Sequence, residues 1–106
     1  MSFHDDKLWQ EAYVALLDVL EATDGMDGDL VKQVRKHAMM VLTETAQAVA
    51  SRDRKLHELK LRNVGTGMIV SLRSLLSVLW GQEALTDDQF GKLDSEYETL
   101  ANKLPH

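Results

Sequence analysis

The sequence has 106 residues, of which 44% are hydrophobic and 27% are charged, and its net charge is -5. One proline and six glycines argue against a disordered or loop-rich β chain, and the lack of cysteine excludes disulfides and thiolate chemistry. We expect a single domain spanning residues 1–106. The first residues lack the basic and apolar parts of a signal peptide, and no apolar stretch is long enough to span a membrane. A soluble, cytoplasmic protein without membrane contact is therefore expected.

The first two helices are predicted from apolar residues at spacings of three and four. A helix over residues 5–22 carries this pattern from Leu8 to Leu20 and begins beside two aspartates that suit a helix N-terminus. A Gly-Met-Asp-Gly turn at 25–28 separates it from a second helix over residues 29–50. The chain is expected to turn again at 51–53. These three residues include neither Gly nor Pro, so a helix that continues through them stays open as an alternative.

The third predicted helix, over residues 54–80, has two faces. Its core-facing residues are expected at steps of three and four: Leu61, Val64, Met68, Leu72, Leu75 and Leu79. A helical wheel gathers a second face of mostly small residues: Asn63, Gly67, Val70, Ser74 and Ser77. Two interpretations stay open for this second face, namely close packing against a helix of the same bundle and contact between subunits.

The last helix is predicted over residues 87–104. Thr86 at the N-cap and Gln89 three residues later match a capping box, and an apolar stripe runs from Phe90 to Leu104 before Pro105 ends the helix. No stretch alternates with the period of two that a strand requires. Four helices joined by short turns predict an all-α, antiparallel up-down-up-down four-helix bundle.

The charged residues are distributed unevenly along the chain. Residues 1–31 have eight acidic side chains and one lysine, a net charge of -7, and residues 74–106 have six acidic side chains and two lysines, a net charge of -4. Residues 32–73 have nine basic and three acidic side chains, a net charge of +6. The candidate residues for binding nucleic acid or a partner are therefore Lys32, Arg35, Lys36, Arg52, Arg54, Lys55, Lys60, Arg62 and Arg73. The alternative is that these charges only solvate the helices and offset their acidic neighbours.

Patterns typical of catalysis or metal binding are not found in the sequence. No Glu precedes a His by three residues, as it does in di-metal bundles, and His37 and His57 lie too far apart for an i, i+4 metal pair. His37 borders an apolar face and is expected to be half-buried and hydrogen-bonded. The aromatic side chains that could stack on bases are expected in the core instead: Trp9, Tyr13, Trp80 and Tyr97. We therefore expect a non-enzymatic protein with no cofactor or metal and without base-specific recognition of single strands.

Four stretches share the pattern of one known family: Leu-Trp-Gln-Glu-Ala at 8–12, Gln-Val-Arg-Lys-His-Ala at 33–38, Val-Gly-Thr-Gly at 64–67, and the run from Leu72 to Phe90. Together they resemble, over nearly the whole chain, the four-helix-bundle proteins named after the 23S rRNA intervening sequence. The relatives of that family include the accessory protein of diversity-generating retroelements. The second stretch looks like the family's Gln-x-Arg-Arg-Ala-Ala motif, and the third stands where the family has a Gly-Ser step.

The resemblance implies a homo-oligomer, commonly a pentamer, that lacks catalytic activity. In the retroelement branch it also implies binding of RNA or DNA and of a reverse transcriptase through basic surfaces. Two features depart from the family: residues 40–48 share only Ala46 with the Ser-Ile-Pro-Ser-Asn-Ile-Ala-Glu-Gly signature of the rRNA-linked branch, and this chain is acidic overall, whereas the retroelement proteins are basic. The alternative function is a protein–protein scaffold, in which the basic residues of one subunit pair with acidic helices of its neighbours.

Overall fold

The computed structural model describes residues 2–106 and is all-helical over that range. Its elements are the 3-10 helix η1 (Phe3–Asp5), α1 (Lys7–Ala22), α2 (Asp29–Ala50), α3 (Arg54–Asn63), the π-helical turn η2 (Val64–Met68), α4 (Ile69–Gly81) and α5 (Asp87–Asn102). α3, η2 and α4 follow one another without a break, so the chain forms four long helices. The predicted all-α class with four helices is confirmed, and the predicted helix ends lie within two residues of the observed ones.

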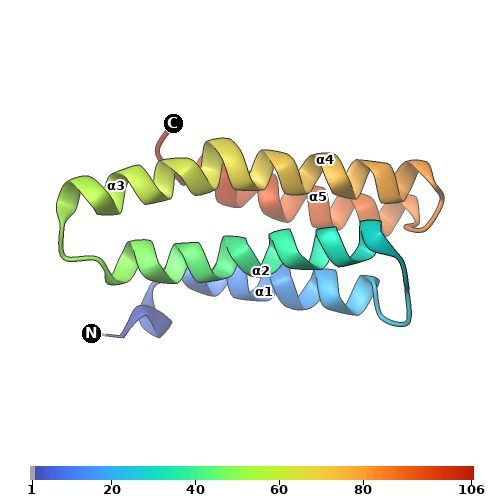
Figure 1. Ribbon diagram of the computed structural model, residues 1–106, viewed down its shortest axis with the longest axis horizontal. Coiled ribbons are helices and arrows are strands. Elements are labelled where there is room, and N and C mark those ends of the chain that lie inside the picture. Colours follow the sequence, from blue (N-terminus) through green and yellow to red (C-terminus); the bar gives the residue numbers. More distant parts are fainter. Residues whose placement is uncertain (1) are drawn as a thin grey trace.

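The four helices lie side by side along the long axis of a body that measures 43 × 24 × 23 Å (Figure 1). α1 packs against α2 and α5, and α4 packs against the same two helices, so each helix has two neighbours. The α2–α3 turn and both termini lie toward one end, whereas the α1–α2 and α4–α5 turns lie at the other (Figure 1). This arrangement is compatible with the predicted up-down-up-down bundle.

Side-chain caps explain where three of the helices begin. Asp6 accepts hydrogen bonds from the backbone N–H groups of Leu8 and Trp9, at 2.8 and 3.1 Å. Asp53 accepts one from Leu56 at 3.1 Å, so the turn expected at 51–53 is a true break between two helices. Before α5, the capping box is confirmed, because Thr86 and Gln89 exchange both hydrogen bonds of that motif. Such caps satisfy the N–H groups that the first turn of a helix leaves without partners.

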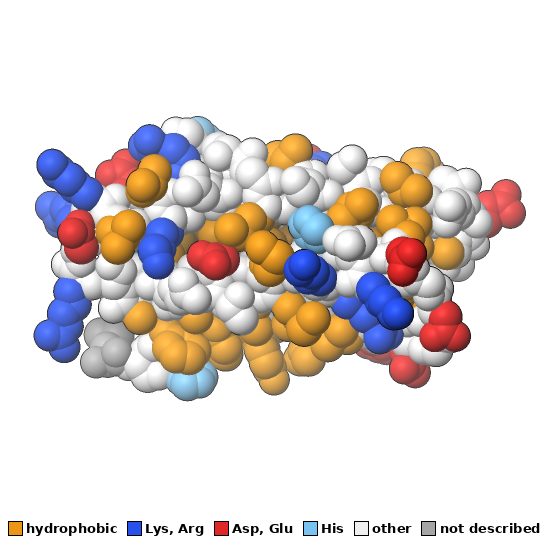
Figure 2. Space-filling model, viewed as in Figure 1, with side chains coloured by type: hydrophobic (Ala, Val, Ile, Leu, Met, Phe, Trp, Pro, Cys, Tyr) orange, Lys and Arg blue, Asp and Glu red, His pale blue; other side chains and the backbone are white. Residues whose placement is uncertain are grey.

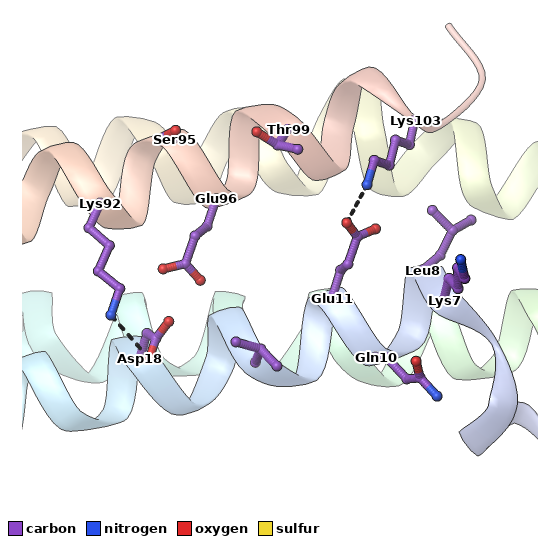
Figure 3. A pocket seen from close by; sticks show the side chains of 11 residues that line it. Lys7, Leu8, Gln10, Glu11, Asp18, Lys92, Ser95, Glu96, Thr99 and Lys103 are labelled. Carbon is purple, nitrogen blue, oxygen red and sulfur yellow. Dashed lines mark hydrogen bonds and ion pairs between the residues drawn. The ribbon is translucent and has the colours of Figure 1, made fainter.

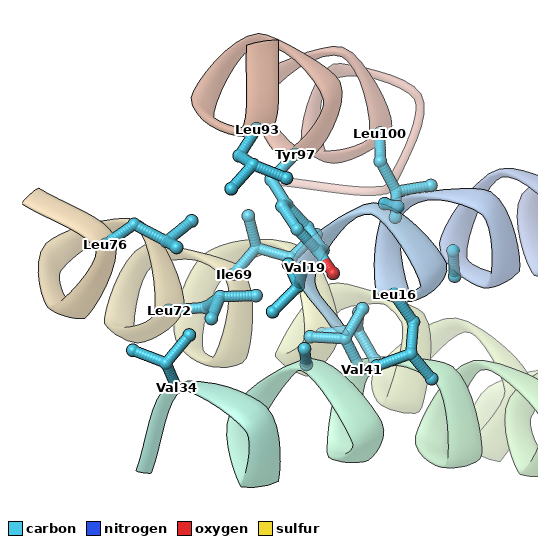
Figure 4. Packing of buried hydrophobic residues seen from close by; sticks show 14 of the residues in the cluster. Leu16, Val19, Val34, Val41, Ile69, Leu72, Leu76, Leu93, Tyr97 and Leu100 are labelled. Carbon is cyan, nitrogen blue, oxygen red and sulfur yellow. The ribbon is translucent and has the colours of Figure 1, made fainter. Parts of the chain in front are cut away.

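The core consists of one apolar stripe from each helix. Figure 4 shows Tyr97 of α5 at its centre, beside Ile69 of α4 and Val19 of α1. Each of these three side chains is fully buried, and the same holds for Val34, Val41, Leu72 and Leu76. Removing such a side chain from water stabilises the fold by about 1.5–3 kcal/mol. The core thus holds the four helices together, and it leaves the outer half of each helix for other contacts.

The π-helical turn η2 shifts the core-facing positions of the long helix by one residue. The N–H of Ile69 donates to the carbonyl of Val64, five residues earlier, as a π-helix requires. The buried residues after this turn are Ile69, Leu72, Leu76 and Leu79. Met68 and Leu75, which the predicted stripe includes, are half-buried and pack against the edge of the core. A helical wheel drawn with 3.6 residues per turn does not include the extra residue that a π-helical turn adds.

Only one of the two glycines in η2 is needed for packing. A Cβ on Gly65 would lie 3.1 Å from the Cβ of Leu104, whereas a Cβ on Gly67 would meet no atom within 4 Å. Gly65 is buried and Gly67 is exposed. The close approach between the long helix and the C-terminal segment therefore depends on Gly65.

By length and composition alone, the helix Arg54–Gly81 is apolar enough to cross a membrane, which was not expected from the sequence. A core helix of a soluble bundle passes the same test. Only 28% of its most apolar stretch is buried here, so the helix presents much of its surface to the outside.

The two glycine positions make a matched test of this packing. Replacing either glycine by Ala removes the same intrinsic helix penalty of roughly 1 kcal/mol. Gly67→Ala is expected to raise the free energy of unfolding by up to that amount. Gly65→Ala forces Leu104 to move, and overpacking costs about 1–3 kcal/mol, so this variant should be less stable than Gly67→Ala by about 1 kcal/mol or more. Urea unfolding of both variants measures the difference, and equal midpoints would show that the Leu104 contact is unimportant.

Candidate functional site

Three basic residues lie together and exposed at the turn from α2 to α3. Arg52 is in the turn itself, and Arg54 and Lys55 are in the first turn of α3. None of them forms an ion pair with any residue from 2 to 106. Figure 2 shows Lys and Arg side chains projecting from this end of the molecule, and a second group of them beside Asp and Glu side chains toward the opposite end. We call Arg52, Arg54 and Lys55 the basic corner.

The basic corner opposes the intrinsic electrostatics of its own helix. The first turn of a helix carries a partial positive charge, so cations there are unfavourable by a few tenths of a kcal/mol or more. Arg54 and Lys55 occupy this turn, and the Asp53 carboxylate that caps it offsets only part of the cost. Their placement does not serve helix stability, which favours a role in binding an anion from outside.

Two other candidates, Lys60 and Arg62, extend the basic corner along α3. The Nζ of Lys60 lies 3.4 Å from the Oε1 of Gln47, and Arg62 pairs with Glu58 one turn earlier at 3.2 Å. The Arg62–Glu58 pair is exposed on both sides. Such pairs contribute about 0–1 kcal/mol, so an external anion competes easily for these cations.

Arg35 and Arg73, two of the predicted binding residues, are both engaged in hydrogen bonds to other parts of the same chain. The Nε and Nη2 atoms of Arg35 donate to the hydroxyl and carbonyl of buried Thr23, at 2.9 and 2.7 Å. They thus give a hydrogen-bond partner to a backbone carbonyl at the C-terminal end of α1. Arg73 donates two hydrogen bonds to Asp94, at 2.8 and 3.0 Å, and one to Glu98 at 3.1 Å. The hydrogen bond to Asp94 is the main reason that the pKa of Arg73 is raised. Sequence spacing shows which residues share a helix face, but it does not show what faces them from another helix.

Lys32 and Lys36 are exposed in the first turns of α2, far from the basic corner. At 1.5 Å per residue, they lie about 20 Å or more along the helix from its C-terminal end. The nine predicted cations therefore divide into a corner group, a separate pair on α2 and two structural arginines.

The small-residue face of the long helix points outward. Asn63, Gly67, Val70, Ser74 and Ser77 are all exposed. Close packing of this face within the same chain was one of two open interpretations, and the structure contradicts it. Gly65, on the opposite side, is the glycine that packs closely. A wheel groups such residues correctly, but it does not tell whether the group faces a neighbouring helix or solvent.

Two of the four aromatic residues predicted in the core are instead largely exposed. Tyr97 is buried, but Tyr13 and Trp80 are each 42% exposed. Trp80 stacks on Phe90 with ring centroids 4.6 Å apart, and its indole N–H donates to Asp87. Tyr13 stacks on Trp9 at 5.2 Å, and Trp9 in turn meets Phe3 at 5.3 Å. His37 is half-buried with its Nδ1 2.8 Å from the carbonyl of Gln33, as predicted.

An open groove of about 1060 Å³ between α1 and α5 contains a pair of carboxylates that sequence reasoning missed. Figure 3 shows Glu96 of α5 between two ion pairs that cross the groove, Lys92 with Asp18 and Lys103 with Glu11. One carboxylate oxygen of Glu96 is buried and has no hydrogen-bond partner among residues 2–106. Asp18 and Glu96 are far apart in sequence, and no local motif connects them.

Glu96 has a raised pKa in this groove. Burial, followed by hydrogen bonding to Asp18 and the negative charge of Asp18, raises the pKa of Glu96 to about 7, although the Lys92 ammonium acts in the opposite direction. Burial, together with the charges of Glu96 and Asp18, also raises the pKa of Tyr97, whose hydroxyl has no partner in the described chain. No group of three or more metal-binding side chains occurs among residues 2–106. The groove therefore places a carboxyl group with a raised pKa between the first and last helices.

Comparison with known proteins identified no relative: no family model, no curated protein and no solved structure matches this chain.

The carboxyl pair predicts a pH-dependent stability. In the unfolded chain Glu96 titrates near its ordinary pKa of 4.5, and in the folded chain near 7, so the folded state holds an extra proton between these values. The free energy of unfolding should therefore fall as pH rises from about 4.5 to about 7, and stay lower above it. Glu96→Gln removes this loss and should be more stable than the original at pH 8 by on the order of 1 kcal/mol, because the groove is partly open to water.

Thermal unfolding at pH 4.5 and pH 8 measures this effect. Glu21→Gln, which changes an exposed carboxylate on the same side of the bundle as Asp18, serves as the control and should keep the pH profile of the original. If Glu96→Gln also keeps that profile, the pKa of Glu96 is not raised in the folded protein.

Proposed function

We propose that this chain is a non-enzymatic accessory protein, an up-down-up-down bundle that self-associates and binds the phosphate backbone of RNA or DNA through its basic corner. The observation that carries the proposal is the exposure of Arg52, Arg54 and Lys55 at one end of the molecule without ion pairs, in a helix turn that gains nothing from them. The proposal assigns no catalytic residue, cofactor or metal.

The chemistry of the corner suits phosphates rather than bases. Lysine and arginine bind phosphate oxygens irrespective of sequence, and release of counterions makes such binding sensitive to salt. Base-specific recognition of single strands requires aromatic side chains beside the cations. The exposed Trp80 lies in the last turn of α4, far along the long helix from Arg54, and is already stacked on Phe90. Sequence-independent binding is therefore the form that we propose.

The resemblance to the 23S rRNA intervening-sequence and retroelement accessory proteins supports the same function. A pentamer, as that family commonly forms, would bring five basic corners to one rim if its subunits were parallel. Five corners would bind nucleic acid far more tightly than one, because each further contact becomes intramolecular. A reverse transcriptase with bound nucleic acid would present the same phosphate groups to the basic corner.

A second candidate function, a protein–protein scaffold, is favoured by the exposed apolar residues. Leu17, Leu59 and Val70 are each about half exposed, and monomeric proteins rarely present extended apolar surface without a partner. In this alternative the basic residues pair with acidic helices of neighbouring subunits and bind no nucleic acid.

A matched pair of double variants tests the nucleic-acid function. Arg54→Glu with Lys55→Glu changes the corner, and Lys32→Glu with Lys36→Glu makes the same change of charge elsewhere. The first variant should bind fluorescein-labelled single-stranded RNA about tenfold or more weakly. The slope of log K against log salt should become smaller in magnitude by about 1.4, because each of the two lost phosphate contacts accounts for roughly 0.7. The control should bind nearly as the original does. Fluorescence anisotropy at several salt concentrations measures both quantities.

The corner substitutions do not endanger the fold. Glutamates are favourable in the first turn of a helix, so circular dichroism should show unchanged or increased helix stability. Equal losses of binding in both variants would mean that only net charge matters. If the original protein does not bind RNA or duplex DNA at any salt concentration, the scaffold function replaces this proposal.

Self-association is tested by light scattering coupled to size exclusion. The proposal predicts a single species with several times the mass of one chain, and a pentamer if the family resemblance extends to assembly. Because the segments have net charges of -7, +6 and -4, the assembly should loosen in high salt. A monomer at all concentrations would contradict self-association while leaving the nucleic-acid test unaffected.

A further inference from the structure

His57 joins the end of α2 to the start of α3 beside the basic corner. Its Nδ1 atom lies 2.7 Å from the backbone carbonyl of Ala48, nine residues earlier in the chain. A carbonyl oxygen only accepts hydrogen bonds, so the hydrogen of the neutral ring must be on Nδ1. The same carbonyl accepts the backbone N–H of Ser51 at 3.2 Å. The imidazole ring is therefore held from one side by the last turn of α2.

The other side of the ring is free to meet a ligand. The Nε2 atom of His57 has no hydrogen-bond partner among residues 2–106, and it is not one of the buried unpartnered atoms of that range. In the neutral ring Nε2 has only a lone pair, which cannot bind a phosphate oxygen because both are acceptors. When the ring gains a proton, Nε2 becomes a donor, and Nδ1 keeps its bond to Ala48. Protonation thus changes what the outer edge of the ring binds without requiring the ring to move.

The charged groups around His57 do not neutralise it. No carboxylate of residues 2–106 forms an ion pair with the ring. The carboxylate of Asp53 is engaged with the N–H of Leu56, and Arg54 lies on the same helix, three residues before His57. The other charged neighbours are Glu58 and Lys60 on α3, Glu44 one turn before Ala48 on α2, and Asp5, Asp6 and Lys7, which share a hollow with Arg52. A proton on His57 therefore adds a positive charge to the basic corner.

We infer that His57 is a fourth phosphate-binding residue of the basic corner and that it binds in its protonated form. The inference rests on the proposed binding of nucleic acid and adds a proton-dependent residue to that site. Side chains three residues apart on a helix are neighbours, so the Nε2–H of His57 and the guanidinium of Arg54 can donate to the same phosphate or to adjacent ones. Histidine is the side chain that ordinarily changes its charge between pH 5 and pH 8. Nucleic acid should then bind more tightly at the acidic end of that range.

The affinity for a uridine oligonucleotide at pH 5.5 and pH 8 tests this role. Uracil and the phosphodiester do not change their charge between these values, so any difference comes from the protein. With a rhodamine label and fluorescence anisotropy, the original protein should bind about threefold or more tightly at pH 5.5. The slope of log K against log salt should become larger in magnitude by about 0.7, for one added phosphate contact.

His57→Asn separates this residue from the other groups that gain protons at acidic pH. The asparagine amide can donate to Ala48 in place of Nδ1, but it does not gain a charge, so about threefold of the affinity gain should be lost. His37→Asn is the matched control. The Nδ1 of His37 lies 2.8 Å from the carbonyl of Gln33 in its own helix, and the residue is roughly 20 Å along α2 from the corner. This variant should keep the pH effect of the original.

A full pH effect in His57→Asn, or none in the original protein, would overturn the inference and leave the binding of nucleic acid standing. A protein that binds no RNA at either pH would overturn both. The ring nitrogens can also be observed directly in the original protein by ¹⁵N NMR, which does not depend on the folding of a variant. We expect the Nδ1–H form of His57 at pH 8, and at pH 5.5 a shift of its Nε2 signal when RNA is added. The opposite tautomer, or an Nε2 signal that RNA does not shift, would contradict the assigned role.

Discussion

Each helix in this protein packs against only two others, so the outer half of every helix faces away from the core. This constraint governs the rest of the structure. The inner stripes are fully used: Val34, Val41, Ile69, Leu72 and Leu76 are completely buried, and they leave little freedom for a binding cavity in the interior. Any function must then lie on the outer surfaces. These surfaces are unusual for a monomer, since they combine unpaired cations at one end with half-exposed apolar residues such as Leu17 and Val70.

The sequence predicted the fold well because helix periodicity and caps are local. Apolar spacing located all four helices, and the Thr86–Gln89 capping box marked the start of the last one correctly. The features that the sequence could not show are those that depend on contacts between helices. Arg35 and Arg73 resembled surface cations until the structure placed Thr23 and Asp94 beside them. Asp18 and Glu96 meet only because the first and last helices are neighbours.

The candidate site was predicted in part. Exposure of Arg52, Arg54 and Lys55 follows from their place at a turn, which the sequence indicated. Exposure of Tyr13 and Trp80 did not follow, because a residue that continues an apolar spacing is ordinarily counted as core. Core residues and outer apolar residues differ only in their direction around the helix axis, which changes by roughly 100° per residue. When apolar residues cover a broad part of a helix, the sequence does not show which of them face the core.

The basic corner and the exposed residues around Gly67 and Val70 lie at different heights along the long helix. Arg54 and Lys55 are in the first turn of α3, whereas Gly67 and Val70 lie more than three turns further along the long helix. The ion pairs of Arg73 with Asp94 and Glu98 link α5 to the long helix.

The wide turn at Val64–Met68 has a consequence for the evolution of this chain. An ordinary helix that gains or loses one residue rotates everything beyond that point by about 100°, which would turn core residues outward. Here the extra residue is contained in the π-helical hydrogen bond from Ile69 to Val64. Loss of one residue between them would restore regular helix geometry and leave Ile69, Leu72 and Leu76 in phase with the core. At this place the long helix tolerates a change of one residue in length without exchanging its buried side for its exposed side.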